Sequence, residues 1–183
     1  SPLHGAVTGD AYRTRLAAVY EAPEMAADIA AIYHACAGRP TIGTYCTAVL
    51  RTRNDGFQLR GLTIENSYDE SIPGNLHQAV AFDSDGADRV QLEQVRLLGN
   101  QDTLFMRAPA PGRIARVFIR KSYIEGDVDF IFGSATAYFL ESEIRWVGGP
   151  RGARSGFITA ASTNISVPYG FVFENCDFTS DGQ

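Results

Sequence analysis

From residue 41 onward, the apolar side chains recur in an eight-residue pattern. Positions 1, 3, 6 and 8 of the pattern are apolar or small, and the five copies begin at Phe57, Val90, Val117, Ala137 and Phe171. Two short alternating strands joined by a bend would place all four of these positions on one side. Each copy therefore predicts a pair of strands with one buried face.

The spacing of the copies predicts a solenoid. They begin at residues 57, 90, 117, 137 and 171, and repeats of roughly 20–50 residues indicate stacked units. Further short apolar runs at 79–82, 130–132 and 157–160 make about three strands per turn. We predict an all-β parallel β-helix, in which each turn buries its inward side chains against the next. A β-sandwich of short strands is the alternative, but the sequence has few of the tight hairpin signals that it requires.

A different periodicity precedes residue 41. Apolar side chains recur at intervals of three and four, which predicts helices over about 11–20 and 23–37. Pro23 is suited to a first helical turn, and Gly38 followed by Pro40 ends the segment. We treat 1–183 as a single partial domain in which 11–37 is a helical insertion and 41–183 forms the β-helix turns.

Composition narrows the class of protein. The chain has 183 residues, of which 45% are apolar and 20% charged, with a net charge of −5. These values are typical of a folded domain with a core. No block of Lys and Arg indicates a nucleic-acid partner, and no apolar run approaches the roughly 20 residues that would span a membrane. Cys36 and Cys46 lie close enough in sequence to form a disulfide, whereas Cys176 lies in an apolar strand pattern and is expected to be buried.

Several common catalytic motifs are missing from the sequence. It contains no Gly-x-Ser-x-Gly, His-Glu-x-x-His, Cys-x-x-Cys or Walker pattern, and only three histidines. A zinc site lacks ligands. We therefore predict no metal and no cofactor.

Polar residues interrupt the strand-like runs at three points. Gln78, the pair Gln101-Asp102, and Asp129 each come just before an apolar run. The separations 78 to 101 and 102 to 129 are each about one turn, so these side chains could stack about 4.8 Å apart. Two adjacent carboxylates can divide into an ionised nucleophile and a protonated acid, and amides can stabilise an oxyanion. The alternative is that these aspartates cap bends or pair with arginines. The constellation favours ester or glycoside hydrolysis without histidine.

Four motifs carry a family resemblance. They are Gly61-Leu-Thr-Ile-Glu-Asn66, Gln78-Ala-Val-Ala-Phe82, Gln101-Asp-Thr-Leu-Phe105 and Asp129-Phe-Ile-Phe-Gly133. In this order and spacing they resemble the pectin methylesterases, carbohydrate esterases built on a right-handed parallel β-helix. The resemblance covers about residues 41–183, and the helical preface is similar to an insertion in larger bacterial members.

The resemblance implies a role for each polar residue. Asp129 would be the nucleophile on the methyl ester carbonyl of galacturonate, and Asp102 would be the general acid and then the base that activates water. Gln101 would stabilise the oxyanion, and Gln78 would help to bind substrate and to hold the charge of the oxyanion. Carboxylate attack would give an anhydride intermediate and divide hydrolysis into two steps.

Other expectations follow from the same resemblance. Phe105 and Phe130 are candidates to pack against sugar rings, with core packing as the alternative. The partner would be methyl-esterified pectin. We expect a monomer that is secreted or held at the cell envelope, where an outer-membrane lipoprotein is one form that the parent protein could take.

One family feature is absent from the sequence. The family also uses an arginine within a Leu-Gly-Arg-Pro-Trp stretch, and neither Arg151 nor Arg154 matches it. We therefore expect this chain to be a fragment that is poorly soluble and nearly inactive by itself.

Rival functions remain at this stage. One is a re-purposed or non-catalytic relative that binds polysaccharide or cleaves another ester. Another is a β-helix lyase, which would need Ca²⁺ and its 6–8 oxygen ligands, or a glycosidase with two carboxylates. The Gln101-Asp-Thr-Leu and Asp129-Phe-Ile-Phe-Gly matches favour the esterase.

Overall fold

The structure is a computed structural model. It describes residue 36 and residues 43–70, 78–148 and 156–181. The chain divides into two compact units, Ser1–Ile42 and Gly43–Gln183. Cys36 is helical, and the rest of the two predicted helices lies outside the described residues.

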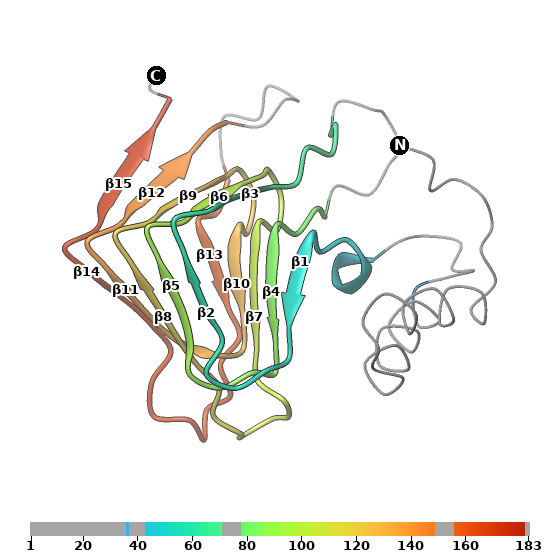
Figure 1. The fold of residues 1–183 in the computed structure, drawn as a ribbon, viewed down its shortest axis with the longest axis vertical. Helices are drawn as coiled ribbons and strands as arrows, with labels where there is room; N and C mark the ends of the chain where they lie inside the picture. The colour runs from blue at the N-terminus through green and yellow to red at the C-terminus, as the bar shows by residue number, and fades with distance from the viewer. Residues whose placement is uncertain (1–35, 37–42, 71–77, 149–155, 182–183) are drawn as a thin grey trace. The chain divides into compact units, whose positions relative to one another are not determined.

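The second unit is a coil of three parallel five-stranded sheets (Figure 1). Sheet A contains β1 (Leu50–Thr52), β4 (Phe82–Asp85), β7 (Leu104–Arg107), β10 (Ile131–Gly133) and β13 (Thr159–Ala161). Sheet B contains β2 (Gln58–Arg60), β5 (Val90–Glu93), β8 (Arg116–Arg120), β11 (Thr136–Leu140) and β14 (Phe171–Glu174). Sheet C contains β3 (Thr63–Glu65), β6 (Arg96–Leu98), β9 (Tyr123–Gly126), β12 (Glu143–Trp146) and β15 (Asp177–Ser180).

Consecutive strands along the chain belong to consecutive sheets, so three strands complete one turn. Every strand pairs in parallel with the strand one turn away, for example β5 with β8 and β8 with β11. This arrangement confirms the parallel β-helix and rules out the β-sandwich. A 3₁₀ helix, η1 (Thr44–Cys46), precedes β1.

The eight-residue pattern corresponds to the strands of sheets B and C and the bend between them. Position 5 of every copy has a positive φ, which lets the chain turn within one residue. These residues are Gly61, Gln94, Lys121, Glu141 and Asn175. In the second copy, positions 1, 3, 6 and 8 are all buried, as the pattern predicts: Val90, Leu92, Val95 and Leu97.

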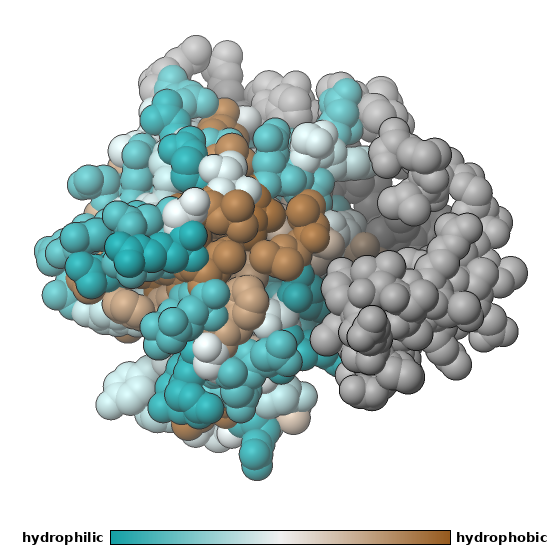
Figure 2. Space-filling model, viewed as in Figure 1, coloured by the Kyte–Doolittle hydropathy of each residue, from teal (hydrophilic) through white to brown (hydrophobic). Residues whose placement is uncertain are grey.

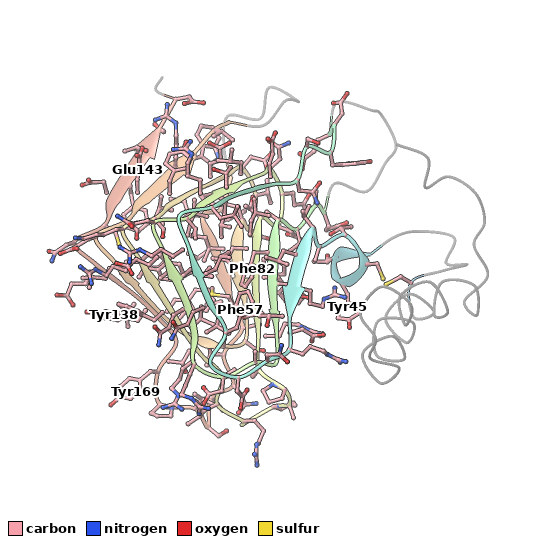
Figure 3. The ribbon with its side chains drawn as sticks, viewed as in Figure 1. Tyr45, Phe57, Phe82, Tyr138, Glu143 and Tyr169 are labelled. Atoms are coloured by element: carbon pink, nitrogen blue, oxygen red, sulfur yellow. The ribbon has the colours of Figure 1, made fainter. Side chains whose placement is uncertain are left out.

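The core fills the interior of the coil. Phe82, Phe130 and Phe139 are its largest fully buried side chains. The ring of Phe57 stacks on that of Phe82 with 6.1 Å between centroids, and Figure 3 shows both inside the coil. Figure 2 shows apolar side chains gathered in the middle of the face in view, with polar side chains around them. Stacking of like residues from turn to turn thus builds one continuous core.

One predicted strand is shifted by three residues. The apolar run at 79–82 is buried, but β4 begins only at Phe82 and continues through Asp83, Ser84 and Asp85, which are also buried. The sequence prediction missed this segment because polar residues seldom occupy buried strands. Its carboxylates are held by arginines on the outer face of sheet A, as described below.

Both Cys36 and Cys46 are disulfide-bonded, whereas Cys176 is a free, half-buried thiol. Among the described residues, no helix is long and apolar enough to cross a membrane.

Gly133, which ends β10, cannot carry a side chain without distorting the neighbouring turn. Its φ is 118°, and an added Cβ would overlap the carbonyl oxygen of Met106. We expect Gly133→Ala to lower the free energy of unfolding by about 3 kcal/mol or more. Gly61→Ala is the matched control, because Gly61 also has a positive φ but open space around it. It should cost only about 1–2 kcal/mol in denaturant titrations. Equal losses in the two variants would contradict this explanation.

Candidate active site

The polar residues singled out by the sequence lie where the chain passes from sheet C to sheet A. Gln101 and Asp102 belong to the connection 99–103 between β6 and β7, and Asp129 belongs to the connection 127–130 between β9 and β10. Gln78 precedes the buried run that leads into β4. The structure therefore brings all four residues to one corner of successive turns.

Asp102 and Asp129 are neighbours across two turns. Leu104 on β7 and Ile131 on β10 are register partners. Asp102 and Asp129 each lie two residues before one of these partners, and the Asp102 N–H donates to the Val128 carbonyl at 3.1 Å. Both aspartates have positive φ, 70° for Asp102 and 50° for Asp129. A non-glycine residue in this conformation costs energy and is often found at functional sites. The two bends thus have the same local conformation on neighbouring turns.

Thr103 helps to hold the first bend in place. Its buried hydroxyl donates to the Glu125 carbonyl at 2.8 Å, one turn away. The residue that follows Asp102 in the motif is thereby tied to the next turn, which limits movement of the carboxylate.

The two carboxylates have different surroundings. Asp102 is only 6% exposed, whereas Asp129 is half-buried. The pKa of Asp102 is raised to about 6, mainly because the group is buried; a hydrogen bond from Thr44 opposes this rise, and the negative charges of Asp129 and Asp127 contribute to it. A carboxyl group with a pKa near neutrality can both donate and accept a proton at working pH.

Asp127 has a local structural partner. Its Oδ1 accepts a hydrogen bond from the Val128 N–H at 2.6 Å, and its own carbonyl accepts one from the Trp146 indole at 3.0 Å. These two hydrogen bonds hold the bend in its conformation. Among the described residues, Asp129 forms no salt bridge with an arginine.

The two glutamines lie beside each other on adjacent turns. The Ala79 N–H donates to the Gln101 carbonyl at 3.0 Å, and the Gln101 N–H donates to Glu70 Oε1 at 2.8 Å. The Gln78 Oε1 atom is buried without a hydrogen-bond partner among the described residues. An unpaired buried amide costs about 1–3 kcal/mol, so a bound ligand that paired with it would recover energy.

The two candidate phenylalanines have separate places in the fold. Phe130 is fully buried and belongs to the core. The prediction that it packs against sugar rings is therefore wrong, and the alternative, core packing, is correct. Phe105 is half-buried and stacks on Phe132, with 4.3 Å between centroids and 8° between ring planes. Phe130 directly follows Asp129, at the bend where the chain turns inward. Phe105 and Phe132 are the second residues of β7 and β10, and their side chains face outward.

The sequence interpretation missed residues of η1 and β1 that contact Asp102 and the neighbouring strand β4. The Thr44 hydroxyl donates to Asp102 Oδ2 at 3.0 Å, and the Tyr45 hydroxyl donates to Asp85 Oδ2 at 3.1 Å. Arg51 pairs with Asp83 at 2.8 Å. These residues are far from Asp102 in sequence and lie in no recurring motif, so no periodic signal could have marked them.

Comparison with known proteins decides the family. The family model described as Pectinesterase matches residues 26–183. The chain belongs to the pectinesterase family. It is 40% identical over 158 residues to Pectinesterase B of Pectobacterium parmentieri. It is also 35% identical over 160 residues to the putative acyl-CoA thioester hydrolase YbhC of Escherichia coli.

Solved structures of similar proteins share the fold. The crystal structure of Escherichia coli YbhC superposes with a TM-score of 0.75 at 34% identity, over 82% of this chain and 40% of that one. A pectin methylesterase in complex with hexasaccharide VII superposes with a TM-score of 0.66 at 29% identity, over 77% of this chain and 44% of that one.

This member of the pectinesterase family spans less than half the length of the two curated relatives named above. The match to Pectinesterase B covers 82% of this chain and 39% of the relative, and the match to YbhC covers 83% of this chain and 37% of the relative.

Proposed function

We propose that this pectinesterase chain carries the catalytic carboxylates of a carbohydrate esterase, which hydrolyses methyl esters of galacturonate in pectin and releases methanol. The observation that carries the proposal is the pair Asp102 and Asp129 on adjacent turns, one buried with a raised pKa and the other half-buried. Gln78 and Gln101 lie at the same corner. The structure of a relative with a bound hexasaccharide supports a pectic substrate.

The first chemical step forms an acyl-enzyme. The Asp129 carboxylate attacks the ester carbonyl carbon, and the carbonyl oxygen becomes an oxyanion that the Gln101 and Gln78 amides stabilise. The bond to the methoxy oxygen then breaks as Asp102 gives its proton to that oxygen, so methanol leaves. An anhydride joins Asp129 to the sugar carboxyl.

The second step restores the enzyme. Asp102, now ionised, takes a proton from water, and the resulting hydroxide attacks the anhydride at the sugar carbonyl. The bond between the sugar carbonyl carbon and the Asp129 oxygen breaks, so Asp129 leaves as a carboxylate and Asp102 keeps the proton taken from water. The product is galacturonic acid, which ionises to galacturonate by losing its proton to solvent. A pKa near 6 suits both roles, because a group that alternates between acid and base works best near its own pKa.

A second candidate is hydrolysis of a thioester. It is favoured by the similarity to YbhC, whose name describes a putative acyl-CoA thioester hydrolase. The same nucleophile and acid could cleave a thioester, and the leaving group would then be a thiol.

Product analysis on the protein at its natural length separates these functions. We expect methanol from methyl-esterified pectin, no new reducing ends, and no free thiol from acyl-CoA. Thiol release without methanol would favour the thioesterase, and reducing ends without methanol would favour a glycosidase or lyase. Binding of pectin without any product would indicate a re-purposed relative.

We also propose that the protein acts outside the cytoplasm, as a monomer and without a metal or cofactor. The disulfide-bonded state of Cys36 and Cys46 supports the location, because disulfides persist mainly in oxidising compartments.

A further inference from the structure

Thr44 reaches Asp102 from a different turn of the coil. The two residues are 58 positions apart in sequence, yet the Thr44 hydroxyl lies 3.0 Å from Asp102 Oδ2. Because Asp102 is only 6% exposed, this hydroxyl is one of few polar groups that can contact its carboxylate.

We propose that Thr44 is the positioning residue for Asp102, and that Arg51 holds Thr44 in place by clamping η1 onto the outer face of sheet A. The proposal rests on the proposed esterase function. Thr44 engages Oδ2, which leaves Oδ1 to exchange the proton with methoxide or water. Oδ2 remains a hydrogen-bond acceptor whether or not Oδ1 carries the proton, so the Thr44 hydroxyl can donate to Oδ2 in both states of the cycle.

Hydrogen bonds fix η1 to the neighbouring turn. Thr47, the residue after η1, donates through its hydroxyl to the Thr44 carbonyl at 2.8 Å and accepts from the Val80 N–H at 3.0 Å. The Asn66 side-chain amide donates to the carbonyls of Thr47 and Val80 at 3.0 and 2.9 Å. These contacts fix the position of η1 relative to the buried residues 79–82.

Arg51 supplies the second attachment. Its guanidinium lies 3.8 Å from the centre of the Tyr45 ring, and Nη2 donates to the Tyr45 carbonyl. Nε donates to Asp83 at 2.8 Å, and this pair is largely buried, with 12% of the Arg51 side chain and none of the Asp83 side chain exposed. Only a planar group with several donors can make these contacts at once. The backbone next to Thr44 is thereby fixed.

The charges around Asp102 indicate what the Thr44 contact does. Asp127 and Asp129 disfavour the ionised form, as burial does, and Thr44 favours it. Glu70 adds a further carboxyl group at the Gln101 N–H. Removing the hydroxyl should therefore raise the pKa of Asp102, which makes this carboxyl group a weaker acid.

The test compares Thr44→Val with Thr44→Ser in the protein at its natural length. The Asp102 carboxyl is titrated by ¹³C NMR, and its signal is assigned by its loss in Asp102→Asn. We expect Thr44→Val to raise the Asp102 pKa by about one unit, since a hydrogen bond to a charged group is worth about that much. It should lower kcat about tenfold with KM within about twofold. Thr44→Ser should restore both values.

The matched control is Thr136→Val. Thr136 also donates a hydrogen bond through its hydroxyl, but its acceptor is the backbone carbonyl of Tyr169 at 2.8 Å, and it lies on sheet B. We expect this variant to titrate and turn over as the parent does. An unchanged Asp102 pKa in Thr44→Val, or a Ser variant as impaired as the Val variant, would overturn the proposal.

A further variant tests the clamp. Arg51→Lys keeps a positive charge beside Asp83 but cannot also donate to Tyr45 and stack on its ring. We expect a smaller shift of the Asp102 pKa in the same direction, with a kcat between those of the parent and Thr44→Val. An Asp102 pKa identical to the parent's would remove Arg51 from the proposal. If the protein releases no methanol, the proposed function fails, whereas the titration still decides the role of Thr44.

Discussion

Replacing Asp129 with Asn should lower methanol release from methyl-esterified pectin by about 10⁴-fold or more, as removal of a nucleophile commonly does. An amide has the shape of the carboxylate but cannot form the anhydride. Asp129 is half-buried and forms no salt bridge among the described residues, so the change should leave the fold intact. Initial rates of methanol release, measured with a folding check by circular dichroism, test this.

Two other aspartates serve as controls. Asp177→Asn removes an exposed charge on β15 and should leave the rate as it is in the parent. Asp127→Asn removes a buried carboxylate two residues from Asp129, whose Oδ1 accepts a hydrogen bond from the Val128 N–H of the same bend. It should retain far more activity than Asp129→Asn. Comparable losses in the Asp127 and Asp129 variants would contradict the assignment of the nucleophile.

Replacing Asp102 with Asn should reduce methanol release by about 10²–10⁴-fold, the usual range for loss of a general acid and base. The Asn side chain can still accept a hydrogen bond from Thr44, so the geometry is largely kept. What is lost is the proton that the methoxide leaving group requires. Esters with a better leaving group should be affected less, because they need less protonation in the transition state. Equal losses for good and poor leaving groups would argue against Asp102 as the acid.

The same substitution should stabilise the protein at alkaline pH. Burial and the nearby carboxylates raise the pKa of Asp102 from 3.8 to about 6, so the native state binds its proton more tightly than the unfolded state does. Stability from this group is therefore complete below about pH 4 and is lost as the pH rises through about 6. Above that pH the ionised Asp102 costs on the order of 1–3 kcal/mol.

Asp102→Asn removes this cost. We expect its free energy of unfolding to exceed that of the parent at pH 8 and to approach it at pH 4, measured in denaturant titrations at both values. A variant that is less stable than the parent at pH 8 would show that the buried charge does not lower the free energy of unfolding. It would contradict the environment described for Asp102.

The positions of the strands in sheets B and C could be predicted from the sequence because their inward residues alternate regularly. Val90, Leu92, Val95 and Leu97 follow the pattern and are buried together. Sheet A was harder to predict, since β4 contains Asp83, Ser84 and Asp85. Their burial depends on arginines from other turns, such as Arg51 and Arg107, and pairing between turns leaves no local pattern.

The sequence also selected the polar residues of the corner, because Gln78, Gln101, Asp102 and Asp129 interrupt apolar runs at intervals of about one turn. It could not separate Phe105 from Phe130, since each is a phenylalanine within a motif that contains an aspartate. The bend at Asp129 turns Phe130 into the core, and the strand places Phe105 outside against Phe132.

The sequence by itself determined that this chain is a stacked parallel coil with two carboxylates and two amides about one turn apart. The apolar periodicity is a local property, because it can be read from the sequence of each turn by itself. Only the tertiary structure decided the protonation of Asp102 and the place of Thr44 beside it. Both depend on burial and on a residue 58 positions away, and those arise only when the turns stack.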